Sequence, residues 1–568
     1  MEIALKLLRV LLLGISCYGY IQVLSKKIKT EFTIAVLFHG ICCIMFFAGI
    51  LNMLKESAWA ILLLGVYLAI LTLKDRTAIQ NILRPGLLFF LICGIILFAY
   101  LKDRLFFEYD DFSHWGTALK VMINNRRFPN FIDGAVLFQS YPLGSAAFIF
   151  YFVYITGISS EWFQLFMQAM YIAGIMVSLF AYAKGWIGNF FAALFAAVLM
   201  QCISSLDNMS VDTLLAVTAF GAALFCYYYR DSLVEHRQYL GLYTVALVAI
   251  KNSGILFAIG IFAFGLFFVR KCKSTLVRWS VAGLYPLVTL FLWQKHVQLV
   301  YRSGLSSPHT MTGSKVLNSF LLKDGESLLS ITRVFLQKVF SPENEFLYFL
   351  ILIILLLCLS RKTSADTKQL SYLAGFSVLF YVVYQFFLFG MYLTTMPYNE
   401  AIRLASYARY HYTALVFCCS FLYLMIMHLV NSPSLPRMKH ALAYLLSSVL
   451  IFSSLFPGLW YKSDKYRVPI RKDFQQLIED ADIKISRSYF IVVDSDFSSV
   501  YASYLSHVPR YLLNSGKTYV CDVKDYATLE KGWDGYDYLI VFGDSPALMD
   551  FLAAQGLTPE HPVIERDA

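Results

Sequence analysis

Apolar runs long enough, or nearly long enough, to cross about 30 Å of hydrocarbon recur along this chain, separated by short charged loops. The candidate spans are 3–24, 31–53, 57–73, 85–101, 162–182, 187–204, 211–229, 239–253, 255–269, 277–294, 346–360, 370–394, 411–430 and 440–457. We therefore expect an all-α polytopic membrane protein with about 14 transmembrane helices.

The composition excludes a water-soluble enzyme. Hydrophobic residues make up 58% of the 568 residues and charged ones only 15%, whereas soluble domains average about 25% charged residues. The net charge of +10 reflects an excess of Lys and Arg, which in the loops of a membrane protein sets the topology. Because no isolated basic domain exists, we expect no nucleic-acid partner. The 11 cysteines have neither metal-ligand spacing nor a paired extracellular pattern. The expected partner is the lipid bilayer.

One apolar run, at 141–158, is left out of the spans because of the charges around it. Basic residues gather upstream at 26–29 and 74–84, and downstream at 184, 230–237, 270–278, 361–368 and 437–439. All of these clusters are cytoplasmic only if the run lies on the outer face or dips in and returns. We therefore expect residues 102–160 to form one large external loop with an interfacial apolar helix. The loops 204–211, 295–345 and 395–410 then also face outward.

The composition of the chain changes after about residue 457, where charged residues become frequent and no further apolar run is long enough to span a membrane. Short β-rich runs at Tyr489–Val493, Thr518–Cys521 and Tyr538–Phe542 alternate with helical patterns near 498–507 and 546–555. Such alternation predicts a small C-terminal α/β extramembrane domain with a parallel sheet, at 458–568 and outside the cell.

Acidic and aromatic residues are concentrated just after the span that ends near residue 101. The segment Glu108-Tyr109-Asp110-Asp111-Phe112-Ser113-His114-Trp115 places carboxylates in an aromatic setting at the membrane surface. Partial desolvation would raise their pKa values and make them better bases, although a solvated loop could also carry them without a function. Asp110 and Asp111 are the candidate catalytic residues, with Glu108 as third choice.

The order of motifs resembles that of the GT-C membrane glycosyltransferases. The acid pair is followed by an amphipathic stretch, the basic-proline turn 125–129 and Tyr141-Pro142-Leu143. This order is similar to that of the lipid-linked aminoarabinose transferase and protein O-mannosyltransferase type. Residues 206–215 resemble the family's second external loop, and 250–254 resemble its Thr-Lys-Gly turn. The resemblance covers 85–457, so residues 1–84 would be N-terminal extra transmembrane helices before a GT-C-like catalytic core.

The resemblance implies transfer of a sugar from a polyprenyl-phosphate-linked donor to an acceptor hydroxyl at the outer membrane face. The acceptor is a glycan, a lipid or a protein, and one carboxylate of the first loop serves as general base. The attacking hydroxyl needs a base, and the leaving lipid phosphate needs cationic partners. A donor of this kind and the charge bias favour a bacterial plasma membrane, with the C-terminal domain extracytoplasmic.

External cations are scarce in this topology and are therefore candidates for phosphate binding. Lys251 lies at the outer end of a span, and Arg403 and Arg409 lie in the late external segment 399–411. Arginine suits bidentate phosphate binding. The alternatives are a snorkelling lysine and arginines that anchor the interface beside tyrosines.

Three more residues complete the predicted substrate site. Asp212 opens a span and would bind sugar or a cation, or cap its helix. His114 would position the acceptor or hydrogen-bond to backbone, and Tyr141 belongs to the Tyr-Pro-Leu motif. Aminoarabinose transferase-like members have a lysine just before that proline, where this chain has Ser140-Tyr141. We predict no metal site, although Asp110, Asp111 and Asp212 could together bind a divalent cation.

Two other classes of function compete with the transferase. A surface-polysaccharide polymerase or ligase would concentrate Arg and His in one large late loop, whereas here the acids lie in the first loop. A lipid-linked sugar transporter or flippase would carry charges at mid-membrane and internal repeats. The ionisable residues cluster instead at the ends of the spans, which favours the transferase.

Overall fold

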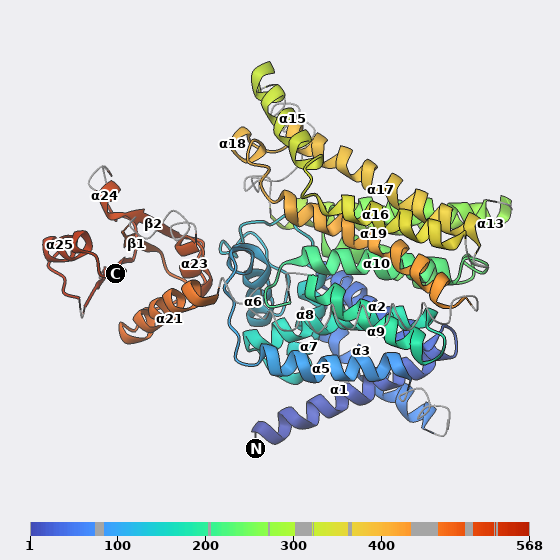
Figure 1. Ribbon diagram of the computed structural model, residues 1–568. Helices are drawn as coiled ribbons and strands as arrows, with labels where there is room; N and C mark the ends of the chain where they lie inside the picture. The colour runs from blue at the N-terminus through green and yellow to red at the C-terminus, as the bar shows by residue number, and fades with distance from the viewer. Residues whose placement is uncertain are drawn as a thin grey trace.

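The protein is a bundle of helices followed by a small α/β unit (Figure 1). The computed structural model describes residues 2–73, 84–202, 206–270, 273–301, 321, 323–361, 366–432, 464–494, 504–526, 529, 532–559 and 561–566. The predicted span 440–457 and residues 302–320 and 322 of the loop 295–345 lie outside these residues.

Eight helical segments among the described residues are long and apolar enough to cross a bilayer. They are α1 (Glu2–Ser25), α2 (Thr30–Ile50), α3 (Leu54–Thr72), α8 (Glu161–Met176) with its 3-10 extension η2 (Val177–Tyr182), α10 (Val211–Tyr228), α13 (Lys273–Val300), α17 (Thr367–Thr394) and α19 (Tyr407–Val430). Shorter apolar helices are α5 (Pro85–Leu101), α7 (Gly144–Thr156), α9 (Gly185–Cys202), α12 (Gly254–Val269) and α16 (Glu345–Ser360). The chain is therefore a multi-span helical membrane protein.

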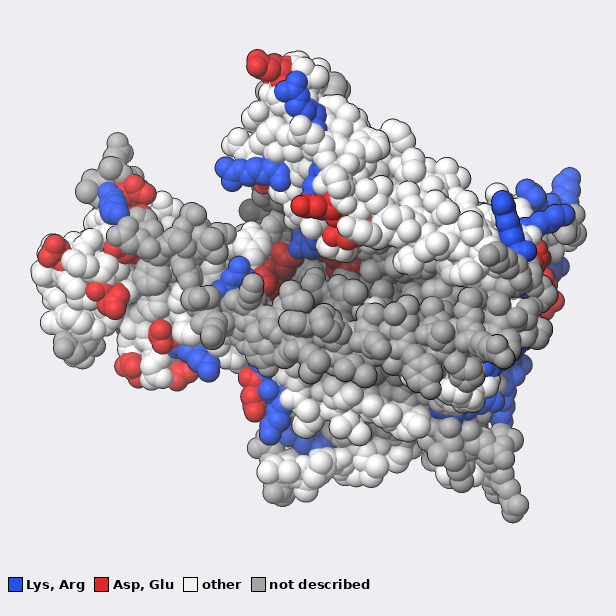
Figure 2. Space-filling view, in the orientation of Figure 1, with Lys and Arg blue, Asp and Glu red and all other residues white. Residues whose placement is uncertain are grey.

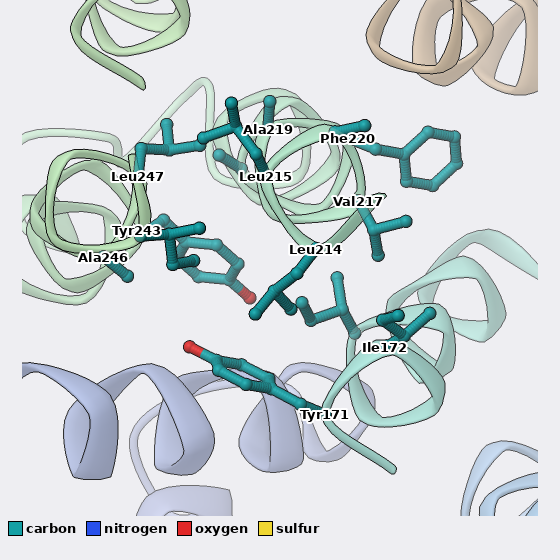
Figure 3. Close-up of a cluster of buried hydrophobic side chains, with 14 of the residues drawn as sticks. Tyr171, Ile172, Leu214, Leu215, Val217, Ala219, Phe220, Tyr243, Ala246 and Leu247 are labelled. Atoms are coloured by element: carbon teal, nitrogen blue, oxygen red, sulfur yellow. The ribbon is translucent and has the colours of Figure 1, made fainter. Parts of the chain in front are cut away.

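The helices form an inner and an outer group. Nearly every residue of α2 and α10 is buried, whereas α1, α3 and α13 expose apolar side chains such as Leu63 and Phe291. Figure 3 shows the inner packing, where Tyr171 of α8 and Tyr243 of α11 (Arg237–Ile250) point their hydroxyls toward each other beside Leu214 of α10. An apolar outer surface is what a lipid environment requires.

Residues 102–160 start and end at the same end of the bundle. The amide of Phe106, just after α5, donates to the carboxylate of Glu161 at the start of α8, at 2.7 Å. Between them lie the π-helical turn η1 (Asp111–Trp115), α6 (Gly116–Asn125) and α7. Asn252, after α11, and Trp293 of α13 both donate to the carbonyl of Ser140, at 3.1 and 2.9 Å. The first loop thus lies against the ends of several helices.

The expectation of an interfacial helix at 141–158 is corrected by α7. This helix is buried along nearly its whole length and packs against α1, α2, α6 and α8. A helix that lies on a membrane surface needs one polar face. The sequence of α7 is apolar on every face, so the protein encloses it.

The C-terminal unit contains a four-stranded sheet in the order β2-β1-β3-β4. The three expected strands are confirmed as β1 (Tyr489–Val493), β2 (Thr518–Asp522) and β3 (Tyr538–Val541), which pair in parallel. A fourth strand, β4 (Val563–Glu565), pairs antiparallel with β3, so the sheet is mixed and the expectation of a purely parallel sheet is corrected. β4 has only three residues, too few for a recognisable period-2 pattern.

The helices described beside this sheet are α21 (Asp464–Asp480), α23 (Val508–Leu512), α24 (Val523–Tyr526) and α25 (Pro546–Ala554). The helical pattern expected near 546–555 corresponds to α25. The pattern expected near 498–507 lies mostly outside the described residues. Figure 1 shows α21 and α23 on the side of the unit that faces the helical bundle.

Candidate functional site

A cavity of about 1670 Å³ opens at the end of the bundle where the first loop lies. Its lining comes from η1, the segment before α7, the starts of α10, α12 and α19, and parts of α13 and α17. Figure 2, which views the bundle from its side, shows acidic and basic side chains gathered in a hollow of the surface. Sites for drug-sized ligands typically measure about 300–1,000 Å³, so this cavity has room for a longer molecule.

Four charged side chains form an alternating chain in the cavity wall. Arg409 pairs with Asp110 through one guanidinium nitrogen and with Asp212 through another, the second contact measuring 3.1 Å. Lys251 reaches the other oxygen of Asp212 at 2.5 Å. All four residues line the cavity. Two anions balance two cations, which makes their burial tolerable.

The local structure explains why these four residues meet. Asp212 lies in the first turn of α10, where a carboxylate is favoured by the helix dipole. Lys251 is the extended residue that ends α11, and Arg409 lies in the first turn of α19. Asp110 immediately precedes η1. Three helix ends and one turn therefore point their charged side chains at one place.

Asp111 is adjacent to Asp110 but has a different environment. Its side chain is fully buried, and its oxygens accept the amides of Phe107, Glu108 and Met209 at 3.1, 2.9 and 2.6 Å. Burial raises the pKa of Asp111 to about 8, although the three amide donors oppose the shift. Met209 belongs to the loop before α10, so Asp111 ties the 102–160 loop to the loop before α10.

Glu108 points toward the C-terminal unit. Its carboxylate pairs with Arg467 of α21 at 2.7 Å, and Glu108 is not among the described residues that line the cavity. In this position it holds two parts of the chain together.

His114 and Tyr141 belong to an aromatic wall of the cavity. The Tyr141 ring stacks on Trp115 and Phe138 with centroids 5.6 and 5.4 Å apart, and His114 meets Tyr141 edge-on at 5.3 Å. Burial lowers the pKa of His114 to about 3, so its imidazole is neutral. One ring nitrogen lies 2.6 Å from the hydroxyl of Ser113. Flat aromatic faces of this kind suit the apolar faces of a sugar ring.

Arg403 is not brought to the charged chain. It is exposed in the turn between α18 (Tyr398–Ala401) and α19 and is absent from the described lining of the cavity. The structure thus separates the two arginines of the 399–411 segment.

Three cavity residues did not stand out in the sequence. Tyr410 lies between the cations, with Lys251 5.2 Å and Arg409 5.7 Å from its ring centroid. Asn252 lines the cavity with a buried side-chain oxygen that has no hydrogen-bond partner among the described residues. Lys323 donates to the carbonyl of Leu393 at the end of α17. The only sequence signal for Asn252 is its place beside Lys251. Tyr410 and Lys323 have no sequence signal beyond their places in the segments 399–411 and 295–345.

The part of the cavity between α13 and α17, here called the apolar wing, is lined by apolar side chains and reaches the lipid-facing surface. Leu290 and Val297 of α13 and Val383, Phe387 and Met391 of α17 line it. Phe387 is 54% exposed, as expected where a cavity opens toward lipid. The cavity therefore combines a charged end with an apolar wing.

The residues present do not fit a divalent cation. Asp110 and Asp212 share Arg409, and Lys251 occupies the remaining oxygen contact of Asp212. Asp111 uses its oxygens for backbone amides. No group of three or more metal-binding side chains occurs among the described residues. A metal would have to displace two fixed cations, which argues against one at this place.

Comparison of the chain with protein-family models, with curated proteins and with solved structures gives no match.

Proposed function

We propose that this protein is a glycosyltransferase that moves a sugar from a polyprenyl-phosphate-linked donor to an acceptor hydroxyl, with Asp110 as general base. The observation that best supports this proposal is the position of Asp110 in the cavity wall. Asp110 pairs there with Arg409, which also pairs with Asp212, and Lys251 and the apolar part of the cavity lie beside them. The order of motifs that resembles the GT-C core over residues 85–457 supports the same assignment. In this proposal the shorter apolar helices α5, α9, α12 and α16 also cross the membrane, whereas α7 does not, and the whole chain has about 14 spans.

The cations are suited to the phosphate of the donor. Lys251 and Arg409 are the basic partners of the charged chain, and each is held by a carboxylate. A donor phosphate would compete with Asp110 for Arg409 and release the Asp110 carboxylate. The apolar wing between α13 and α17 would take the first isoprene units of the carrier.

Transfer then needs one proton acceptor and one leaving group. The acceptor oxygen attacks the anomeric carbon, the bond from that carbon to the phosphate oxygen breaks, and the proton passes to Asp110. The polyprenyl phosphate leaves with the bonding electrons, and Lys251 and Arg409 stabilise its charge. The aromatic wall that contains Tyr141 would contact a sugar ring, and the free oxygen of Asn252 would accept a hydrogen bond from a sugar hydroxyl.

The charge distribution favours an outer-face site. Basic residues at the opposite ends of the helices include Lys273, which begins α13, and Lys368 in the first turn of α17. The positive-inside rule makes that end cytoplasmic. The cavity and the C-terminal unit would then face outward from a bacterial plasma membrane.

The test is complementation of a deletion strain, with mass spectrometry of its surface glycans. Asp110→Asn should reduce the sugar modification at least about 100-fold, because an amide cannot accept the proton. Asp103→Asn is the matched control, since Asp103 is an exposed acid of the same loop outside the cavity lining. Its backbone φ of 66° is one that Asn also adopts. Full modification by Asp110→Asn would exclude the base, and translocation of the donor without transfer would favour a flippase.

A further inference from the structure

The C-terminal unit contacts the first external loop through a buried ion pair. Arg471 of α21 is 2% exposed and forms a two-pronged pair with Glu161, with distances of 2.7 and 2.6 Å. The same guanidinium donates to the carbonyl of Phe106 at 2.7 Å. Because Glu161 also accepts the amide of Phe106, both backbone polar groups of Phe106 are held.

Aromatic side chains of the unit pack on the loop beside this pair. Phe112, fully buried, meets Tyr504 and Tyr511 edge-on with centroids 5.7 and 5.3 Å apart. The hydroxyl of Tyr511 donates to Glu161 at 2.7 Å. From the loop side, Lys120 of α6 donates to the carbonyl of Tyr511, also at 2.7 Å. The loop residues on either side of Asp110 are therefore fixed by the unit.

A second contact lies away from the ion pair. Gly516, just before β2, lies so close to Gly134 of the first loop that a Cβ on Gly516 would be 2.4 Å from the carbonyl carbon of Gly134. Arg510 also donates to the carbonyl of Gly134, at 3.2 Å. The unit thus holds two separate parts of the 102–160 loop, one around Phe106 and Phe112 and the other at Gly134.

From these contacts we infer that the C-terminal unit is a clamp that sets the conformation of the first external loop. Arg471 is a positioning residue: it acts through Phe106 and Glu161 and does not line the cavity. Only three residues lie between Phe106 and Asp110, and the π-turn that follows Asp110 is held by Phe112. The consequence for transfer rests on the proposed function, whereas the clamp itself does not.

Hydrogen exchange followed by mass spectrometry on the full chain in nanodiscs tests the clamp directly. Arg471→Gln and Gly516→Val each remove one of the two contacts. We expect amides of residues 104–116 to exchange at least about tenfold faster in both variants, with α10 still protected. Arg566→Gln is the matched control, because Arg566 belongs to the same unit and pairs with Asp534 on its exposed surface. The control should leave residues 104–116 within about twofold of the parent chain.

Exchange within about twofold of the parent at 104–116 in both variants would overturn the clamp, whether or not the sheet of the unit stays protected. The positioning role has its own readout. With the lipid-linked donor identified by the glycan analysis, Arg471→Gln should lower kcat at least about tenfold and leave the donor KM within about threefold, since Lys251 and Arg409 remain. A faster-exchanging loop with unchanged kcat would overturn the positioning role. If the parent chain transfers no sugar, the proposed function fails and the exchange result still decides the clamp.

Discussion

Asp110 and Asp111 are neighbours in sequence, yet the structure gives them opposite surroundings. Asp110 lines the cavity beside Arg409, and Asp111 is buried among backbone amides. The sequence predicts that this acid pair is important but cannot say which member faces the cavity. A π-helical turn departs from the regular spacing on which such a prediction depends.

Asp111→Asn should destabilise the protein without removing the base. An Asn side chain has one acceptor oxygen and would turn its NH₂ group toward an amide that Asp111 now accepts. A buried donor without a partner costs about 1–3 kcal/mol. Thermal unfolding in detergent should show a lower apparent Tm than the parent chain, and part of the transfer activity should remain. An unchanged Tm at acidic and neutral pH would contradict the structural role.

The same variant should change the pH dependence of stability. The folded-state pKa of Asp111 is about 8, above the value of an unfolded chain. The folded state therefore holds a proton that the unfolded state loses, and stability falls as the pH rises from about 4 to about 8. Asn does not titrate, so the Tm deficit of Asp111→Asn should be largest at the acidic end and should narrow toward pH 8. A deficit that widens with pH would show that Asp111 is ionised.

The other site residues differ in how well the sequence alone predicts their positions. Lys251, Asp212 and Arg409 follow from the pattern of spans, because a charge at the end of a span has little choice of depth in the membrane. Arg403 lies in the same segment as Arg409 but in a turn. In a turn the spacing of residues along the sequence does not determine where a side chain points. Arg471 is beyond sequence reasoning, since its partner Glu161 is 310 residues away.

At the scale of elements, the long apolar helices are the most predictable part of the molecule. Their boundaries follow the hydrophobic pattern because a helix is the structure that satisfies its own backbone in lipid. The helix α7 is less predictable. Its apolar sequence is compatible with a span, an interfacial helix or a buried one, and only packing against α2 and α8 decides.

Helix α17 allows a test of the apolar wing. Gly390 lines the cavity, and a Cβ at this position would meet no atom within 4 Å. Gly390→Phe should therefore place a ring in the apolar part of the cavity and raise the donor KM at least about tenfold, with kcat less affected. The variant should fold normally, because replacing a helical glycine removes an unfavourable residue.

Gly375 supplies the matched control for this variant. It lies in the same helix, a Cβ there also meets nothing within 4 Å, and it is outside the lining of the large cavity. Gly375→Phe should leave the donor KM unchanged. Equal KM values for the two variants would mean that the lipid chain does not lie against α17.

At the scale of the whole molecule, the structure places the site, the first loop and the C-terminal unit together at one end of the bundle. Asp212 begins α10 at that end, and Asp231 follows the end of the same helix. Eighteen helical residues rise about 27 Å at 1.5 Å each, close to the thickness of the hydrocarbon core. Asp231 should therefore lie on the opposite side of the membrane from the cavity.

Labelling of single cysteines in intact cells tests this orientation. Asp103→Cys and Lys517→Cys place thiols on the loop and on the C-terminal unit, and Asp231→Cys places one at the other end; all three positions are exposed. We expect a membrane-impermeant maleimide to label the first two above the parent chain, and the third only after permeabilisation. The reason is the basic bias of the far end. The reverse pattern would put the cavity in the cytosol, where a polyprenyl-phosphate donor for outer-face transfer would not be bound, and the proposed reaction would fail with it.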